Sequence, residues 1–294
     1  MRVHAAFRSS SHAPRILAFT CALALALSVA GSASAKDGPP GFLTDQPAMI
    51  TPLAPGSSVL PIITVPESPK EHKKGGWQFE AIPDGIGFGI FGKKDVRIYV
   101  NHETSTVPFP YNPNNPNPDN SLNDFDNAQV SAITLSLKNA GVLSGSFAIP
   151  SSANYQRFCS NYLVGPAEGF DEPLLLTNEE TSDRVNRTGM AWPPGPDAGQ
   201  AGLAVAYDPG TGSYRSIYGL GRMNHENSVP IPGYGQAVLV TGDDTFAAPS
   251  SQVYMYLAAD RDAVWNDQGH LFGFRSDDPA INDYGDLSGN ASVS

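Results

Sequence analysis

The chain has 294 residues, with 18 lysines and arginines against 29 aspartates and glutamates, and its formal net charge is −11 at pH 7. This balance excludes a nucleic-acid partner held through phosphate contacts, which need a surplus of basic side chains. It fits cation binding and the solubility of an exported protein equally well, so the positions of the acids must decide between them.

Residues 1–35 have the pattern of a secretory signal peptide. Three arginines precede an apolar run over 16–30, and Ala33-Ser34-Ala35 supplies small residues before Lys36. The run is shorter than the roughly 20 residues that a spanning helix needs, and no later segment is apolar for as long. We expect a secreted or periplasmic protein with no membrane span, whose charge becomes −14 because the leader removes three basic and no acidic residues.

The chain contains two cysteines, and Cys21 lies inside the predicted signal peptide. Cys159 would then be alone in a compartment that favours disulfides, and it could form no internal disulfide. Two readings of Cys159 remain open, a small buried apolar side chain or the thiolate ligand of a metal.

Residues 36–76 are rich in Pro, Ser, Gly and Lys, which is typical of a leader or linker, and only Leu60–Val65 resembles a strand. From Trp77 onward, short β-branched or aromatic runs bounded by turn residues predict strands. They are Val96–Val100, Gln129–Leu137, Leu174–Thr177, Leu203–Tyr207, Tyr214–Tyr218, Ala237–Thr241, Val253–Leu257 and His270–Phe274. Asp208–Gly212 reads as a hairpin turn, and no segment has an amphipathic helical period. We therefore predict that 77–294 is one all-β domain, either a sandwich, a barrel or a propeller.

The sequence contains no well-known catalytic or nucleotide-binding motif in the structural context that such a motif requires. Gly87–Gly92 has the spacing of a dinucleotide-binding loop, but it leads into a predicted strand instead of a helix, so we interpret it as a flexible β turn. The chain contains neither a G-x-S-x-G elbow nor an H-E-x-x-H motif, which excludes the corresponding serine hydrolases and zinc proteases.

A weak repeat is the most informative feature of the sequence. Asn101-His102-Glu103-Thr104, Asn178-Glu179-Glu180-Thr181 and Asn224-His225-Glu226-Asn227 share the order Asn, His or Glu, Glu, then Thr or Asn. Each copy follows a strand-like run, and the predicted strand Ala237–Thr241 ends in Gly242-Asp243-Asp244. Asn, Asp and Thr are also ordinary turn residues, and this reading stays open for any single copy.

Side chains alternate across a strand, so in each copy the Asn and the Glu two positions after it would share one face. His102 and His225 would lie on the other face. If the strands occupy equivalent places in successive blades, their ends bring three or four carboxylates together. Such a group is stable only when a cation neutralises it. Carboxylate and Asn carbonyl oxygens favour Ca²⁺.

Three longer segments resemble the PhoX-type alkaline phosphatases in order and spacing. They are Leu176–Glu180, Gly219–Asn227 and Val240–Asp244, followed by Val253–Tyr256. The resemblance covers roughly Trp77 to the C-terminus and is best from Leu174 to Leu257. It implies a secreted six-bladed β-propeller whose axial site holds Ca²⁺ and iron and hydrolyses phosphate monoesters.

The resemblance also implies roles for single residues. Glu179, Glu180 and Glu226 would be metal ligands, with Asp243 or Asp244, and Cys159 would correspond to the thiolate that binds Fe³⁺. The repeat adds Glu103 to this set. This chain has Asn178 where the phosphatases tend to carry Cys, and Asn224 where they carry a basic residue. Arg222 is the substitute that we predict for the missing basic group, with a surface ion pair as its alternative role.

Our first hypothesis is therefore a metal-dependent phosphomonoesterase acting on a small phosphate ester. The alternatives are a non-catalytic Ca²⁺-binding propeller that binds an extracellular partner, which Asn224 favours, and a Ca²⁺-dependent lactonase. At about 40–45 residues per blade, 77–294 would fill four or five blades of a six-bladed family. We expect a propeller truncated at its C-terminus, with first and last sheets that are not hydrogen-bonded to each other and with open, aggregation-prone edges.

Overall fold

The computed structural model describes residues 39–69, 77–80, 82–91, 95–103, 127–181, 184–185, 199–245, 251–274, 278 and 280–281. The chain divides into two compact units, Met1–Asp37 and Gly38–Ser294, and every described residue belongs to the second. The predicted signal peptide lies outside the described residues and stays a prediction.

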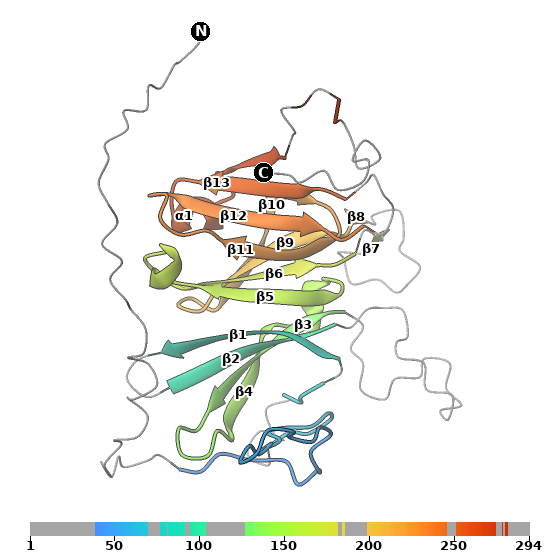
Figure 1. The fold of residues 1–294 in the computed structure, drawn as a ribbon, viewed down its shortest axis with the longest axis vertical. Helices are drawn as coiled ribbons and strands as arrows, with labels where there is room; N and C mark the ends of the chain where they lie inside the picture. Colours follow the sequence, from blue (N-terminus) through green and yellow to red (C-terminus); the bar gives the residue numbers. More distant parts are fainter. Residues whose placement is uncertain are drawn as a thin grey trace. The chain divides into compact units, whose positions relative to one another are not determined.

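Three four-stranded antiparallel sheets follow one another along the second unit (Figure 1). The first contains β1 (Pro83–Phe91), β2 (Asp95–His102), β3 (Gln129–Leu135) and β4 (Val142–Ile149). The second contains β5 (Phe158–Val164), β6 (Leu174–Glu179), β9 (Leu203–Asp208) and β10 (Ser213–Arg222). The third contains β11 (His225–Pro230), β12 (Ala237–Asp243), β13 (Val253–Ala258) and β14 (His270–Gly273). The pair β7 (Arg184–Val185) and β8 (Gly199–Gln200) lies between β6 and β9 in the sequence.

Each large sheet is a meander in which consecutive strands pair, and β5 contacts both β1 and β11. Successive four-stranded sheets whose first strands lie together are the arrangement of propeller blades, which confirms the all-β prediction. The described residues form three such sheets where we expected four or five, and β7 and β8, between β6 and β9, form only a separate two-stranded pair. Within the described residues, no strand of the first sheet pairs with a strand of the third, as expected.

All eight predicted strands after Trp77 are present, and so is the hairpin after β9, where Asp208 Oδ1 accepts from Gly210 N at 2.8 Å. The sequence interpretation is wrong in two places. Gly87–Phe91 is part of strand β1, and Leu60–Val65 forms no strand.

Helical structure in the described residues is confined to short turns. Two 3-10 turns cover Ser151–Ala153 and Pro166–Glu168, and the five-residue helix α1 covers Arg261–Trp265. Asp260 caps α1 by accepting from Ala263 N at 2.8 Å, which explains why the helix forms there without an amphipathic period. The described part of the chain has no helix with the length and hydrophobicity to span a bilayer.

The second sheet is buried on both faces, because the other two sheets pack against it. Along β6, Leu174 and Leu176 contribute to the core shared with the third sheet, whereas Leu175 contributes to the core shared with the first. This explains why β6 and β9 are buried along their whole length instead of alternating between buried and exposed.

Part of the predicted leader packs on the first sheet. Phe42 forms an isolated bridge with Val142 of β4, and Ile62, Ile63 and Val65 pack against the core of that sheet. The segment 39–69 therefore covers an apolar sheet face that would otherwise be exposed.

We expect Leu175→Ala to lower the free energy of unfolding by about 2–5 kcal/mol, because this side chain is 0% exposed between two sheets. Leu137 is 61% exposed, so the matched variant Leu137→Ala should change the free energy by less than about 0.5 kcal/mol. Denaturant titration of both variants measures the difference. Equal stabilities would show that the second sheet is not packed on both faces.

Candidate cation site

The first two strands of each large sheet are interrupted at the same place. The register shifts between Pro83 and Ile86 in the first sheet, between Phe158 and Asn161 in the second and between His225 and Ser228 in the third. In all three, the first strand carries one more residue than its partner, which is a β-bulge. Bulges re-aim side chains and are common beside active sites.

One backbone hydrogen bond closes each interrupted pair in the same way. Glu103 N donates to Ile82 O at 2.9 Å, Glu180 N donates to Arg157 O at 3.0 Å, and Asp244 N donates to Asn224 O at 2.8 Å. Each bond joins the residue after the second strand to the residue before the first strand. Every sheet therefore presents two neighbouring side chains, one from its bulge and one from the end of its second strand.

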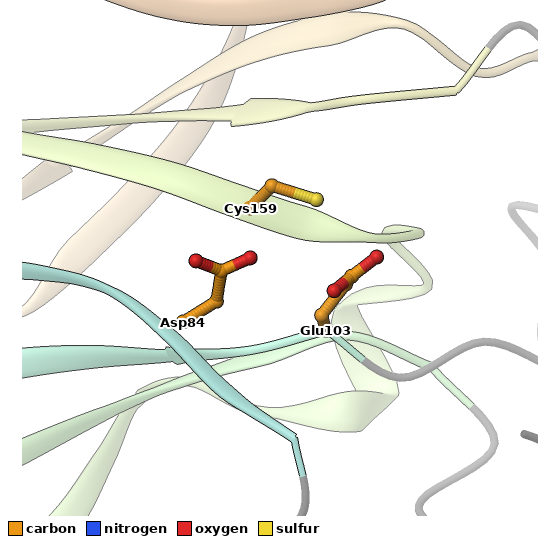
Figure 2. A group of neighbouring side chains, drawn as sticks. All are labelled: Asp84, Glu103 and Cys159. Carbon is orange, nitrogen blue, oxygen red and sulfur yellow. The ribbon is translucent and has the colours of Figure 1, made fainter. Parts of the chain in front are cut away.

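These six side chains form two groups, within each of which the potential ligand atoms lie within 4.8 Å of one another. The first group is Asp84, Glu103 and Cys159, and the second is Glu180, Glu226 and Asp244. Figure 2 shows Asp84, Glu103 and Cys159 pointing into one space from β1, from the end of β2 and from β5. Among the described residues, all three sheets thus contribute to the site.

Cys159 connects the two groups. Burial raises the pKa of its thiol most, and the negative charges of Glu103, Glu180 and Asp84 raise that pKa further. Glu180 belongs to the second group and the other two acids to the first, so the groups are adjoining parts of one cluster. A thiol in such surroundings stays protonated unless a cation offsets the charges around it.

Glu180 is the carboxylate whose protonation responds most to this crowding. Burial is the main cause that raises its pKa from 4.5 to about 7, and the neighbouring Glu226 and Asp244 raise it further against a lowering interaction with Cys159. The pKa of Asp84 is also raised, mainly by burial. The shift of Glu180 thus reflects burial together with the crowding of like charges.

The third copy of the sequence repeat is out of register with the other two. Asn224-His225-Glu226 lies at the start of the first strand of its sheet, so Glu226 corresponds to Asp84 and Cys159. The true equivalent of Glu103 and Glu180 is Asp244. Glu226 still reaches the cluster, because the bulge residue and the strand-end residue lie side by side.

Two predicted ligands lie outside both groups. Glu179 is completely buried, and its carboxylate accepts from Gln156 N at 2.8 Å and from Leu203 N at 3.0 Å. Asp243 Oδ1 accepts from Thr245 Oγ1 at 2.6 Å. Both precede a residue of the two groups by one position, so strand alternation directs their side chains the other way, and their role as ligands stays a prediction.

The histidines of the repeat face away from the carboxylates, as the alternation predicted. His102 is bonded to Glu80 O and Ser131 Oγ, both at 2.7 Å, and burial lowers its pKa to about 4. His225 is bonded to Thr241 Oγ1 at 2.9 Å. Both imidazoles are therefore neutral packing groups at pH 7.

Two asparagines of the repeat, Asn101 and Asn178, join neighbouring sheets through their side-chain amides. Asn101 Nδ2 donates to Ser160 O at 2.9 Å and Thr177 Oγ1 at 3.0 Å, which ties the first sheet to the second. The Asn178 amide shares hydrogen bonds with the hydroxyls of Ser160 at 3.2 Å and Ser228 at 3.0 Å, which ties the second sheet to the third. These bonds fix the sheets beside the acids.

The guanidinium of Arg222, the predicted phosphate-binding group, lies over an aromatic ring. The Arg222 guanidinium, on the strand of the second sheet farthest from β5, stacks over the Tyr218 ring at 5.3 Å from its centroid. Asn224 Nδ2 donates to Asp244 O at 2.6 Å, so this amide holds the strand end. The role of Arg222 stays a prediction.

Sequence reasoning missed Asp84. It lies just before Gly87–Gly92, the segment that we interpreted as a turn, and it belongs to no copy of the repeat. A signal does exist, because Asp84, Cys159 and Glu226 each precede an acidic strand end by a similar number of residues.

The donor chemistry fits cations. Oxygen ligands lie about 2.3–2.6 Å from Ca²⁺, so two ligands of one ion can be up to about 5 Å apart. The separations within each group meet this limit. The second group is all carboxylate, which suits a hard cation, whereas the first adds a thiol, which suits a transition metal.

The fold and site define an all-β protein of propeller-like sheets with a candidate cation site where three sheets meet. No protein-family model and no curated protein matches the chain. Among solved structures, the chain is similar to Pseudomonas fluorescens PhoX in complex with vanadate, a transition state analogue. The TM-score is 0.43 at 17% identity, and the match covers 67% of this chain and 46% of that one. The matched part thus spans less than half of that protein, and the similarity does not establish family membership.

The raised pKa of Glu180 predicts how stability depends on pH in the cation-free protein. Between pH 4.5 and about 7 the folded state holds a proton that the unfolded state has released. This stabilisation is complete below pH 4.5 and is lost as the pH rises through about 7. With chelator present, we expect Tm to fall between pH 5 and pH 8, and Glu180→Gln should reduce this fall. The exposed Glu172→Gln is the control, and an unchanged slope in Glu180→Gln would contradict the prediction.

Proposed function

We propose that the cluster binds cations and that the loaded site hydrolyses phosphate monoesters. The observation that supports cation binding is the convergence of five carboxylates and one thiol from equivalent positions of three sheets. Hydrolysis of a phosphate ester is supported by the resemblance of segments around Glu180, Glu226 and Asp244 to PhoX-type phosphatases.

The ligand sets suggest which ion each group would hold. Glu180, Glu226 and Asp244 would hold Ca²⁺ through carboxylate oxygens alone. Asp84, Glu103 and Cys159 would hold a transition metal such as Fe³⁺, since a thiolate selects such a metal over Ca²⁺. The bulges and the strand-end hydrogen bonds would fix these side chains before any ion arrives.

The chain's own contribution to the reaction is to position charge. When bound, the cations would polarise phosphoryl oxygens and lower the pKa of a coordinated water. The five carboxylates would hold the ions, with Glu180 giving up its proton as they bind. Glu179 would keep the ends of β6 and β9 in place through its two backbone hydrogen bonds.

Binding without catalysis is the second candidate. Its support is specific, because the amide of Asn224 holds a backbone carbonyl where the phosphatases carry a basic residue. A phosphoryl group would lose a bidentate contact that an amide cannot replace.

Ca²⁺ should raise the melting temperature, because the ion binds the folded state alone. At 100 times the dissociation constant the gain is about 2.7 kcal/mol for one site. Calorimetry with excess Ca²⁺ and with chelator measures it, and Glu226→Gln should lose most of the gain, whereas the control Glu172→Gln should keep it. Equal melting temperatures of the unaltered protein under both conditions would refute a Ca²⁺ site.

Turnover of p-nitrophenyl phosphate with Ca²⁺ and iron present tests the catalytic half of the proposal. We expect activity that disappears on chelation and in Glu180→Gln and that persists in Glu172→Gln. Orthovanadate should inhibit it, since vanadate mimics the transferring phosphoryl group. A Ca²⁺-dependent rise in Tm without turnover would leave the non-catalytic binding protein, and turnover of a lactone alone would identify the lactonase.

A further inference from the structure

Strand β1 has a row of glycines on one of its faces. Its sequence alternates Gly85, Gly87 and Gly89 with large apolar residues, so the glycines share a face. None of the three has a positive φ angle. The backbone conformation therefore does not require glycine, and another constraint must explain the row.

That constraint is the closeness of β5. A Cβ atom on Gly85 would lie 2.5 Å from Cys159 O and 2.6 Å from Asn161 N, both of which are backbone atoms. On Gly87 it would lie 2.6 Å from Asn161 Oδ1. On Gly89 it would meet side chains alone, the flexible end of Leu163 with Cδ2 2.6 Å away and the Phe91 ring at 3.2 Å. The demand for glycine is thus strictest beside the cluster.

A side-chain amide fastens the two strands where they are closest. Asn161 Nδ2 donates to Gly85 O at 2.7 Å, and it also lies 2.9 Å from Asn101 Oδ1 and 3.2 Å from Tyr99 O. The second and third sheets are joined differently, because Ser160 Oγ donates to Glu226 O. Because Gly85 and Gly87 have no side chains, the backbone of β1 lies close enough to β5 for Gly85 O to accept a hydrogen bond from Asn161.

We infer that Gly85 and Gly87 are positioning residues of the cation site, because they let β1 approach β5 closely enough for Asp84 to share a ligand group with Cys159. This inference rests on the proposed function. Gly85 has no side chain that could bind a cation, and it would act through the placement of Asp84, the residue before it in β1.

Cation affinity gives the first test, and we expect alanine substitutions at Gly85, Gly87 and Gly89 to have successively smaller effects on it. Loss of outer-shell support typically weakens metal binding about 10–100-fold, and we expect a change in this range for Gly85→Ala by calorimetric titration with Ca²⁺ and with Fe³⁺. Gly87→Ala should show a smaller loss and Gly89→Ala little, because Leu163 can move. The matched control is Gly273→Ala in β14, where a Cβ would have 3.8 Å of space. Affinity unchanged in both Gly85→Ala and Gly87→Ala would overturn the inference.

A second readout needs no cation. In a Cys21→Ser background, Asp84→Cys places a second thiol beside Cys159, and we expect diamide to join the two in the folded, chelated protein. Adding Gly85→Ala should slow the crosslink several-fold, whereas adding Gly273→Ala should not. If Gly85→Ala fails to fold, Gly87→Ala replaces it, and crosslinking as fast as in the Gly273→Ala control would overturn the inference.

The two readouts separate this inference from the proposed function. Weaker ion binding together with slower crosslinking in Gly85→Ala supports both. If the unaltered protein binds no cation but Gly85→Ala still slows the crosslink, the proposed function is wrong and the role of Gly85 in strand approach is confirmed.

Discussion

The site depends on one local constraint, the backbone hydrogen bond that ties each acidic strand end to the residue before the bulged strand of the same sheet. Because the same bond recurs at Glu103, Glu180 and Asp244, all three sheets present their paired side chains at equivalent places. The resulting crowding of negative charge opposes folding. The packing of the second sheet between the other two offsets this cost, which is how strain at functional sites is usually sustained.

Polar contacts between the sheets give the cluster its precision. Apolar packing tolerates small shifts of one sheet against another, but directional hydrogen bonds do not. Asn101 and Asn178, the repeat residues that we first considered as ligands, supply these bonds from equivalent positions of β2 and β6. A site that holds small ions needs such support, since a misplacement of about 1 Å is enough to spoil it.

The sequence predicted the second strand of each sheet, β2, β6 and β12, whose end carries an acid. It missed the first strand of each sheet, β1, β5 and β11, which carries the bulge. β1 is rich in glycine and β11 is largely polar, so neither has the pattern of a strand, yet both contact β5 beside the cluster. Bulges have no sequence signature of their own, which is why Glu226 was assigned to the wrong strand position and Asp84 was missed. The sequence predicted that acidic residues cluster, but it did not predict which strand positions they occupy.

The negative charge of the cluster also determines the order in which cations and substrate would bind in the proposed reaction. A phosphate monoester is a dianion at neutral pH, and the five carboxylates of the cluster would repel it. The largest charge effects on the pKa values of Cys159 and Glu180 come from neighbouring acids. Substrate could approach only after cations had neutralised the carboxylates. Because such coupling is reciprocal, a bound phosphate analogue would in turn strengthen cation binding by the same factor.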